Sequence, residues 1–211
     1  MTKLLIVYYS SYGHMFKMAQ AAAEAVRDKE NYEVRLKKIP ELEQARKGMS
    51  SQEAYVKARE AQSNIPEATN DDLVWADGII WGIPTRYGNM PAQIKQFIDT
   101  TGSLWAEGKL EGKATGIMSS SNNVHGGQES TILTSLVPLL HLGMIYVGSP
   151  YGENQEMFTD RPDKLTGGSP YGPSTIAGSD GSMTPAEEDL AMAGKLARRV
   201  AKVASKVKEL D

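Results

Sequence analysis

The apolar residues of this chain fall into short continuous runs that alternate with stretches of helical periodicity. The first run, from Leu4 to Tyr9, is rich in β-forming residues, and such runs are typical of strands buried on both faces of a parallel sheet. Met15, Met18 and Val26 then recur on one face of a helix. Continued along the chain, the pattern predicts strands at 4–9, 33–39, 78–81, 114–119 and 144–147, with helices around 15–26, 94–98, 132–140 and 184–207.

This alternation of strands and helices implies right-handed β-α-β crossovers. We therefore expect an α/β fold, a doubly wound five-stranded parallel sheet with helices on both faces. Five strands suit the flavodoxin-like version of this fold better than the six-stranded dinucleotide-binding version. The length of 211 residues fits a single domain over 1–211.

Two stretches exceed the minimal fold: an insertion at about 41–66 and a Gly/Pro-rich segment at 148–183. A structureless loop as long as the second is uncommon in a compact domain, so the segment is either disordered or packed on something. Its apolar residues, which include Tyr151, Met157 and Phe158, favour packing near a site or a subunit interface.

Two helix starts carry capping patterns. Ser50-Ser51-Gln52-Glu53 precedes a mostly polar helical run inside the insertion, and Thr184-Pro185-Ala186-Glu187 opens the last helix. In each, a hydroxyl is placed to cap the helix and a carboxylate follows in its first turn.

Composition narrows the functional classes. Lys plus Arg is 23 and Asp plus Glu is 26, which leaves a formal charge of −3 and no indication of a nucleic-acid-binding face. The absence of cysteine excludes disulfides, thiolate metal sites and a cysteine nucleophile. The three histidines lack metal-ligand spacing and no G-x-S-x-G motif occurs, so neither a metal site nor a serine hydrolase is expected. The apolar run at the N-terminus is too short for membrane insertion, and a cytoplasmic location is the default expectation.

In an open α/β sheet, ligands lie beyond the carboxyl ends of the strands. The loop after the first strand, Ser10-Ser11-Tyr12-Gly13-His14-Met15, combines hydroxyls with the backbone N–H groups of a helix N-terminus. Such a loop suits a phosphate. It lacks both the P-loop lysine and the G-x-G-x-x-G turn, so a phosphate monoester such as that of FMN matches best. An ordinary strand-to-helix turn with serine caps explains this loop equally well when it is taken alone.

Two further loops lie at the same edge. Pro84-Thr85-Arg86-Tyr87-Gly88-Asn89 offers an aromatic ring, a guanidinium and backbone amides that can flank a flat heterocycle, although Pro/Gly/Asn turns are common. The loop from Ser119 to Gly127 is rich in small residues that let a ligand approach the backbone. Taken alone, the loop from Ser119 to Gly127 is best explained as a flexible connection.

Together these motifs resemble the WrbA-type NAD(P)H:quinone oxidoreductases. The likeness is carried by the segments 8–14, 82–90, 126–129, 141–144 and 168–178, in the same order and at preserved spacing. It runs from Lys3 to about Leu190. The sequence departs from the family at Tyr87, where phenylalanine is more usual, and at 122–125, where Asn-Asn-Val-His makes the loop one residue longer.

The resemblance implies a flavodoxin-like homotetramer that uses FMN, with NADH or NADPH as co-substrate, to reduce quinones to quinols by two-electron hydride transfer in a ping-pong cycle. It assigns the phosphate to the loop 10–15 and the flavin ring to the loop that contains Thr85, Arg86 and Tyr87. His141 would reach the FMN site, and Trp105 and Tyr12 would flank the substrate. The implied cofactor-binding residues are Ser10, Ser11, Tyr12, Gly13, His14, Met15, Pro84, Thr85, Arg86, Tyr87, Gly88, Asn89, Ser120, Ser121, Asn122, Gly126 and His141. No side chain is expected to act as a general acid, since the flavin carries the chemistry.

Two other functions remain open at this stage. A simple electron-carrier flavodoxin is disfavoured because such carriers are usually strongly acidic and lack a segment like 148–183. A flavin-binding scaffold or regulator is not excluded by the sequence. The preference between NADH and NADPH and the identity of the quinone are not encoded in any recognisable motif.

Overall fold

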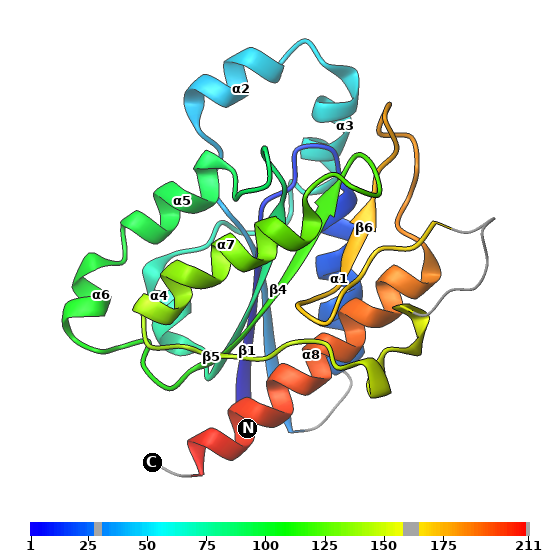
Figure 1. The fold of residues 1–211 in the computed structure, drawn as a ribbon. Coiled ribbons are helices and arrows are strands. Elements are labelled where there is room, and N and C mark those ends of the chain that lie inside the picture. Colours follow the sequence, from blue (N-terminus) through cyan, green and yellow to red (C-terminus); the bar gives the residue numbers. More distant parts are fainter. Residues whose placement is uncertain (28–30, 158–164, 210–211) are drawn as a thin grey trace.

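The computed structural model describes residues 1–27, 31–157 and 165–209. Its core is a parallel sheet with the strand order β2-β1-β3-β4-β5. A sixth strand, β6, pairs in parallel with the carboxyl end of β4 (Figure 1). The strands are β1 (Thr2–Tyr8), β2 (Tyr32–Lys38), β3 (Gly78–Pro84), β4 (Ala114–Ser121), β5 (Ile145–Tyr146) and β6 (Ser174–Ile176).

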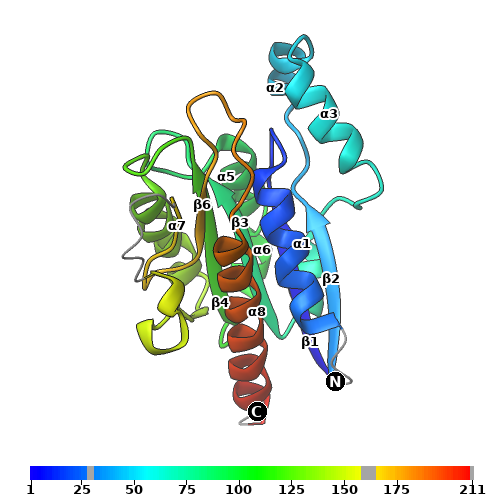
Figure 2. The same cartoon turned by 90° about the vertical axis from the view of Figure 1, so that its right-hand side faces the viewer.

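Helices cover both faces of the sheet (Figures 1 and 2). On one face, α1 (His14–Arg27) and α8 (Glu187–Lys208) bury their apolar sides in a cluster with Leu4, Ile6 and Ile80. On the other, α4 (Asn70–Trp75), α5 (Ala92–Asp99) and α7 (Gln128–His141) pack on the opposite sides of the same strands. The remaining helices are α2 (Glu43–Met49), α3 (Glu53–Ala61), α6 (Gly102–Ala106) and the 3₁₀ turns η1 (Tyr151–Glu153) and η2 (Gln155–Met157).

The predicted fold class is confirmed. Each predicted strand is present within a few residues of its expected position, and β1, β3 and β4 are buried along almost their whole length. The short helices α4 and α6 were not predicted, because six and five residues are too few to show a helical period.

Both predicted helix starts are wrong in detail. Ser50 lies at the C-cap of α2, and α3 begins at Glu53 after an N-cap residue, Gln52, whose side chain makes no capping hydrogen bond. The last helix begins at Glu187, after Thr184. The buried carboxylate of Asp189 accepts the N–H of Ala186 (3.2 Å) and so replaces the expected hydroxyl cap.

The Gly/Pro-rich segment, described at 148–157 and 165–183, packs against the sheet around β6, whereas 151–153 and 179–183 are exposed. Residues 172–177 are all buried, and β6 extends the sheet where the two-residue strand β5 has already ended. The other carboxylate oxygen of Asp189 accepts the N–H of Gly167 (2.9 Å), which fastens the segment to α8. Phe158, also expected to pack, lies outside the described residues.

A buried ionic cluster joins β2 to α4. The carboxylate of Asp72 lies 3.1 Å from the Arg35 guanidinium and 3.4 Å from the Lys37 ammonium. It also accepts the N–H of Thr69 (3.1 Å), whose hydroxyl caps α4 in return. Burial raises the pKa of Asp72, but the hydrogen bonds from Thr69 and Arg35, together with the Lys37 charge, outweigh it and hold that pKa below its ordinary value.

We predict that Asp72→Ala lowers the free energy of unfolding by about 2–4 kcal/mol, because it removes a helix cap and leaves two basic groups without their buried partner. Asp71→Ala, at an exposed position one residue earlier, should change it by less than about 0.5 kcal/mol. Urea unfolding of the two variants tests this. Since the pKa of Asp72 is lowered by folding, the difference between wild type and Asp72→Ala should shrink as the pH falls through that pKa. A difference that does not change with pH would contradict the assignment.

Candidate functional site

Three loops meet beyond the carboxyl ends of β1, β3 and β4 and enclose a cavity of about 70 Å³. The volume is about that of two water molecules in the liquid, so the enclosed part suits a compact group rather than a ring system. Its walls are Ser10, Ser11, Tyr12, His14, Met15, Pro84, Thr85, Arg86, Ser120, Ser121, Asn122, Ala177 and Gly181. All but the last two belong to the loops that the sequence singled out.

The first loop carries the chain from β1 into α1. Gly13 turns the backbone with a φ of +93°, which L side chains rarely adopt, and its N–H donates to Ser10 Oγ (3.0 Å). Among the residues described by the structure, no acceptor is present for the N–H groups of Tyr12, His14 and Met15. The first turn of α1 also has no acidic side chain. The loop thus presents unpaired donors at the positive end of a helix dipole.

His14 fastens this loop to the end of the Gly/Pro-rich segment. Its Nε2 lies 2.8 Å from the carbonyl oxygen of Met183. Because a carbonyl can only accept, Nε2 carries the proton. Burial holds the pKa of His14 below its ordinary value despite the opposing effect of the Met183 carbonyl, so the ring is neutral at pH 7.

The insertion supports the same loop from the other side, and Figure 1 shows α2 and α3 beyond the carboxyl edge of the sheet. The hydroxyl of Tyr12 donates to Gln52 Oε1 (2.6 Å), and Gln62 Nε2 donates to the carbonyl oxygen of Ser10 (3.3 Å). The phosphate-type loop is therefore held between two segments that lie outside the minimal fold.

The loop after β3 forms a tight turn. Arg86 and Asn89 exchange backbone hydrogen bonds (2.8 and 3.1 Å), and the two residues between them, Tyr87 and Gly88, have φ of 54° and 76°. Positive φ at both central positions defines a type I′ turn, which is unusual for tyrosine. The turn leaves the Tyr87 side chain fully exposed at the rim of the cavity. Such strain is typical of functional sites, and here it places an aromatic ring in solvent.

The third loop is anchored at its start and close to its end. Ser119 Oγ donates to the carbonyl oxygen of Ile83 (2.9 Å), and Thr85 N donates to the carbonyl oxygen of Ser120 (2.9 Å), which ties β4 to the second loop. The carbonyl of Asn123 accepts from Ser121 Oγ (2.6 Å) and from Gly126 N (3.0 Å). Ser120, Ser121 and Asn122 line the cavity, whereas Gly126 supports the loop from behind.

Trp105 and His141 are not brought to this cavity within one chain. His141 ends α7, about 20 Å along the helix from the N-terminus that faces the site. Trp105 lies in α6, shortly before β4 begins. Both positions precede the amino ends of strands, at the opposite edge of the sheet, and both side chains are exposed. Gly13, Tyr87, Gly88 and Asn89 belong to the site's loops without lining its enclosed part.

The sequence reasoning missed two groups of residues. Ala177 and Gly181 come from the Gly/Pro-rich segment, whose return past β4 no periodicity indicates. Behind the cavity, Arg86 Nη2 donates to Ser11 Oγ (3.0 Å), and Ser11 Oγ donates to the hydroxyl of Tyr9 (3.1 Å), which donates in turn to Glu41. The position of Glu41, directly after the second predicted strand, could have placed it at this edge.

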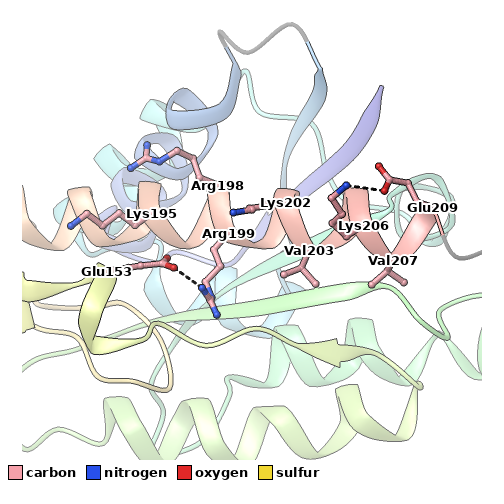
Figure 3. A pocket seen from close by; sticks show the side chains of 9 residues that line it. All are labelled: Glu153, Lys195, Arg198, Arg199, Lys202, Val203, Lys206, Val207 and Glu209. Atoms are coloured by element: carbon pink, nitrogen blue, oxygen red, sulfur yellow. Dashed lines mark hydrogen bonds and ion pairs between the residues drawn. The ribbon is translucent and has the colours of Figure 1, made fainter.

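A larger groove of about 920 Å³ lies along α8 (Figure 3). It is lined by Glu153, Lys195, Arg198, Arg199, Lys202, Val203, Lys206, Val207 and Glu209. Figure 3 shows charged side chains extended along an open helix surface, with Glu153 paired to Arg199 and Glu209 paired to Lys206. None of the three loops reaches it, so the smaller cavity is the candidate site.

Within the described residues, no cluster of His, Asp and Glu side chains could hold a metal ion. The same part of the chain has no helix that is long and apolar enough to cross a bilayer. The donor set at the cavity consists of backbone N–H groups, hydroxyls and one guanidinium, which suits an anionic ligand.

Comparison with known proteins identifies the family of this chain. Residues 2–155 match the family model described as NADPH-dependent FMN reductase. A protein of Geobacter sulfurreducens named NAD(P)H dehydrogenase (quinone) is 49% identical over 204 residues, covering 97% of this chain and 98% of its own length. A protein of the same name from Methanosarcina acetivorans is 45% identical over 213 residues, covering 98% and 99%.

Among solved structures, the flavodoxin-like WrbA-like protein from Agrobacterium tumefaciens superposes with a TM-score of 0.66 at 24% identity and covers 98% of this chain and 99% of its own. The likeness agrees with the α/β fold described above. The resemblance indicated by the loop motifs is confirmed, and the chain belongs to the NADPH-dependent FMN reductase family.

Proposed function

We propose that this protein is an FMN-dependent NAD(P)H:quinone oxidoreductase that reduces quinones to quinols in a ping-pong cycle. The observation that carries the proposal is the set of unpaired N–H groups at the N-terminus of α1, beside the hydroxyl-rich loop 10–15. Relatives that are 45–49% identical over nearly their whole length bear the name NAD(P)H dehydrogenase (quinone).

The residues present fit FMN. The N–H groups of Tyr12, His14 and Met15 would hold the phosphate, and the hydroxyl of Ser10 would be available beside them. Because burial lowers its pKa, His14 would add no positive charge to the phosphate site at pH 7. The loop contains no lysine, so phosphate binding would depend on oriented N–H groups rather than on an ammonium charge.

The cavity of about 70 Å³ encloses a phosphate-sized group only, so the flavin ring would lie across the open rim formed by Arg86, Tyr87 and Asn122. When bound, FMN supplies the redox chemistry by taking a hydride from NAD(P)H and returning two electrons to a quinone. An open rim leaves one ring face accessible, which both substrates would occupy in turn. We assign no general acid or base, and the chain's own part is to bind, orient and partly cover the ring.

We also propose a homotetramer in which Trp105 and His141 act on a neighbouring subunit's site. Three large apolar side chains of α7 face solvent: Leu133, Val137 and Leu140 are 42–54% exposed. They form one stripe at spacings of four and three residues, and His141 follows directly. An exposed apolar stripe of this kind marks a protein-protein contact. It would bring His141 to another copy, because its own cavity is too distant.

Steady-state kinetics with FMN, NADH and benzoquinone test the proposed function. Multiple turnover with parallel lines in double-reciprocal plots, at several fixed quinone concentrations, is the expected result, because NAD(P)H gives up its hydride and leaves as NAD(P)+ before quinone enters. Intersecting lines would contradict the ping-pong cycle. Reduction of the bound flavin only by a partner protein would identify an electron carrier instead, and tight FMN binding without turnover would identify a scaffold.

Tyr87→Asn should weaken FMN binding about two- to tenfold, the contribution of one aromatic contact. Asparagine tolerates the left-handed backbone at this position, so the melting temperature of the apoprotein should not fall. Fluorescence titration of the apoprotein with FMN measures the affinity. Tyr87→Phe is the matched control and should bind FMN as tightly as wild type. Equal affinity in all three proteins would exclude Tyr87 from the flavin site.

Val137→Asp should dissociate the tetramer, because it buries a charge in the proposed contact. Sedimentation velocity of the FMN-loaded protein measures the change in mass. Val56→Asp introduces the same charge at an exposed position on α3 and should leave the assembly intact. A wild-type protein that sediments as a monomer, or a Val137→Asp variant that remains a tetramer, would refute this arrangement.

A further inference from the structure

The Glu41 carboxylate is the centre of a hydrogen-bond cluster behind the candidate cavity. Its Oε1 accepts the N–H of Leu42 (3.0 Å) and Nε2 of Gln93 (2.7 Å). Its Oε2 accepts the hydroxyls of Tyr9 (3.0 Å) and Tyr55 (2.9 Å). These donors come from the residue that follows β1, from α5 and from the insertion, so one carboxylate joins three parts of the chain.

Because the Glu41 oxygens are acceptors, the donor and the acceptor of each hydrogen bond in the cluster can be assigned. Both oxygens of Glu41 accept in every hydrogen bond that they make, so the single hydroxyl proton of Tyr9 points at Glu41. Both lone pairs of the Tyr9 oxygen are then filled, by Ser11 Oγ (3.1 Å) and by Gln93 Nε2 (2.9 Å). Since Ser11 donates its proton to Tyr9, its oxygen is the acceptor for Arg86 Nη2 (3.0 Å).

The cluster lies largely out of reach of water. Tyr9, Ser11 and Gln93 are 2%, 3% and 7% exposed, so water cannot readily replace a lost partner. Burial raises the pKa of Tyr9 well above its ordinary value, partly against the hydrogen bond from Ser11, and burial together with Glu41 raises the pKa of Tyr55 to about 12. Both hydroxyls therefore keep their protons, and donate them, throughout the neutral range.

We propose that Glu41 is a positioning residue for FMN: by receiving the Tyr9 proton, it fixes the orientation of Ser11 and holds Arg86 against the phosphate-binding loop. Ser11 and Arg86 both line the cavity, whereas Glu41, Tyr9 and Gln93 do not. The inference rests on the proposed FMN site and adds to it a residue that acts only through others. The oriented chain Arg86–Ser11–Tyr9–Glu41 removes part of the ordering cost from ligand binding.

Two tyrosines provide a matched pair of variants. Tyr9 and Tyr55 donate to the same carboxylate oxygen over nearly the same distance, but only Tyr9 leads on to Ser11 and Arg86. Tyr9→Phe should raise the dissociation constant of FMN about tenfold, the effect of one hydrogen bond to a charged group. Tyr55→Phe should change it less than about twofold, although it also loses a bond to Glu41. Titration of the apoprotein with FMN gives both values, and apoprotein melting temperatures report on folding.

Glu41→Ala, alone and combined with Tyr9→Phe, tests whether Glu41 affects FMN binding through Tyr9. If Glu41 acts through Tyr9, the double variant should bind FMN no more weakly than the weaker single variant. Glu41→Gln provides the rescue experiment. Its amide oxygen can still accept from Leu42 and Gln93, so it should recover the melting temperature that Glu41→Ala loses. Its amide nitrogen cannot receive the Tyr9 proton, and its amide oxygen offers that hydroxyl only the longer of the two contacts (3.2 Å, to Oε1), so FMN affinity should stay several-fold below wild type.

The outcomes separate this inference from the proposed function. Wild-type protein that does not bind FMN overturns both. Wild-type protein that binds FMN, together with a Tyr9→Phe variant that binds equally well, overturns the positioning role alone. The same holds if Tyr55→Phe weakens binding as much as Tyr9→Phe, if the two losses multiply in the double variant, or if Glu41→Gln restores affinity together with stability. If Glu41→Ala does not fold, the two tyrosine variants still decide the matter.

Discussion

The burial of β1 and β3 on both faces is the constraint on which the rest of this structure depends. Parallel neighbours cannot be joined through a hairpin, so the chain crosses over by helices, and these helices cover the two faces of the strands. Every loop that follows a strand then leaves from one edge. The residue pairing of Tyr8 with Gly82, and of Gly82 with Met118, aligns β1, β3 and β4 so that their loops start side by side. The site is where it is because three strand ends coincide.

Adjacent strand ends do not by themselves make ordered loops, since a loop with free N–H groups has few hydrogen bonds of its own to fix its backbone. Here the ordering comes from two segments outside the minimal fold. The insertion contacts the first loop through Gln52 and Gln62, and the Gly/Pro-rich segment contacts it through the Met183 carbonyl. That second segment is itself fixed by β6 and by buried Asp189. The donors at α1 are thus kept open for a ligand while the backbone around them is fixed.

The sequence was sufficient for strands β1 to β5 and for the three loops, because both follow from local patterns, whereas β6 was not predicted. A buried strand shows as an apolar run, and a loop that follows it must lie at the carboxyl edge. It was not sufficient for contacts that depend on where a long irregular segment passes. Ala177 and Gly181 reach the cavity because an irregular segment returns past β4, and no sequence periodicity predicts that path. In the sequence, Glu41 is only a polar residue after a proline, and its importance shows once the structure places Tyr9 and Gln93 against it. His141 shows a different limit. The resemblance gives it a role at the FMN site, but the fold places it at the opposite edge of the sheet from the cavity of its own chain.

The small enclosed volume and the open rim together indicate how selectivity would be divided in the proposed enzyme. Anion recognition would lie in the closed part, where the free N–H groups and the oriented Ser11 leave little freedom. The rim is less ordered by contacts, because the Tyr87 side chain there is fully exposed to solvent. A site built this way would select one cofactor strictly and accept flat substrates broadly. Any narrower choice among quinones would have to come from groups beyond the rim. In the proposed tetramer, the exposed stripe of α7, which would bring His141 to a neighbouring copy, is the surface of this chain best placed to supply them.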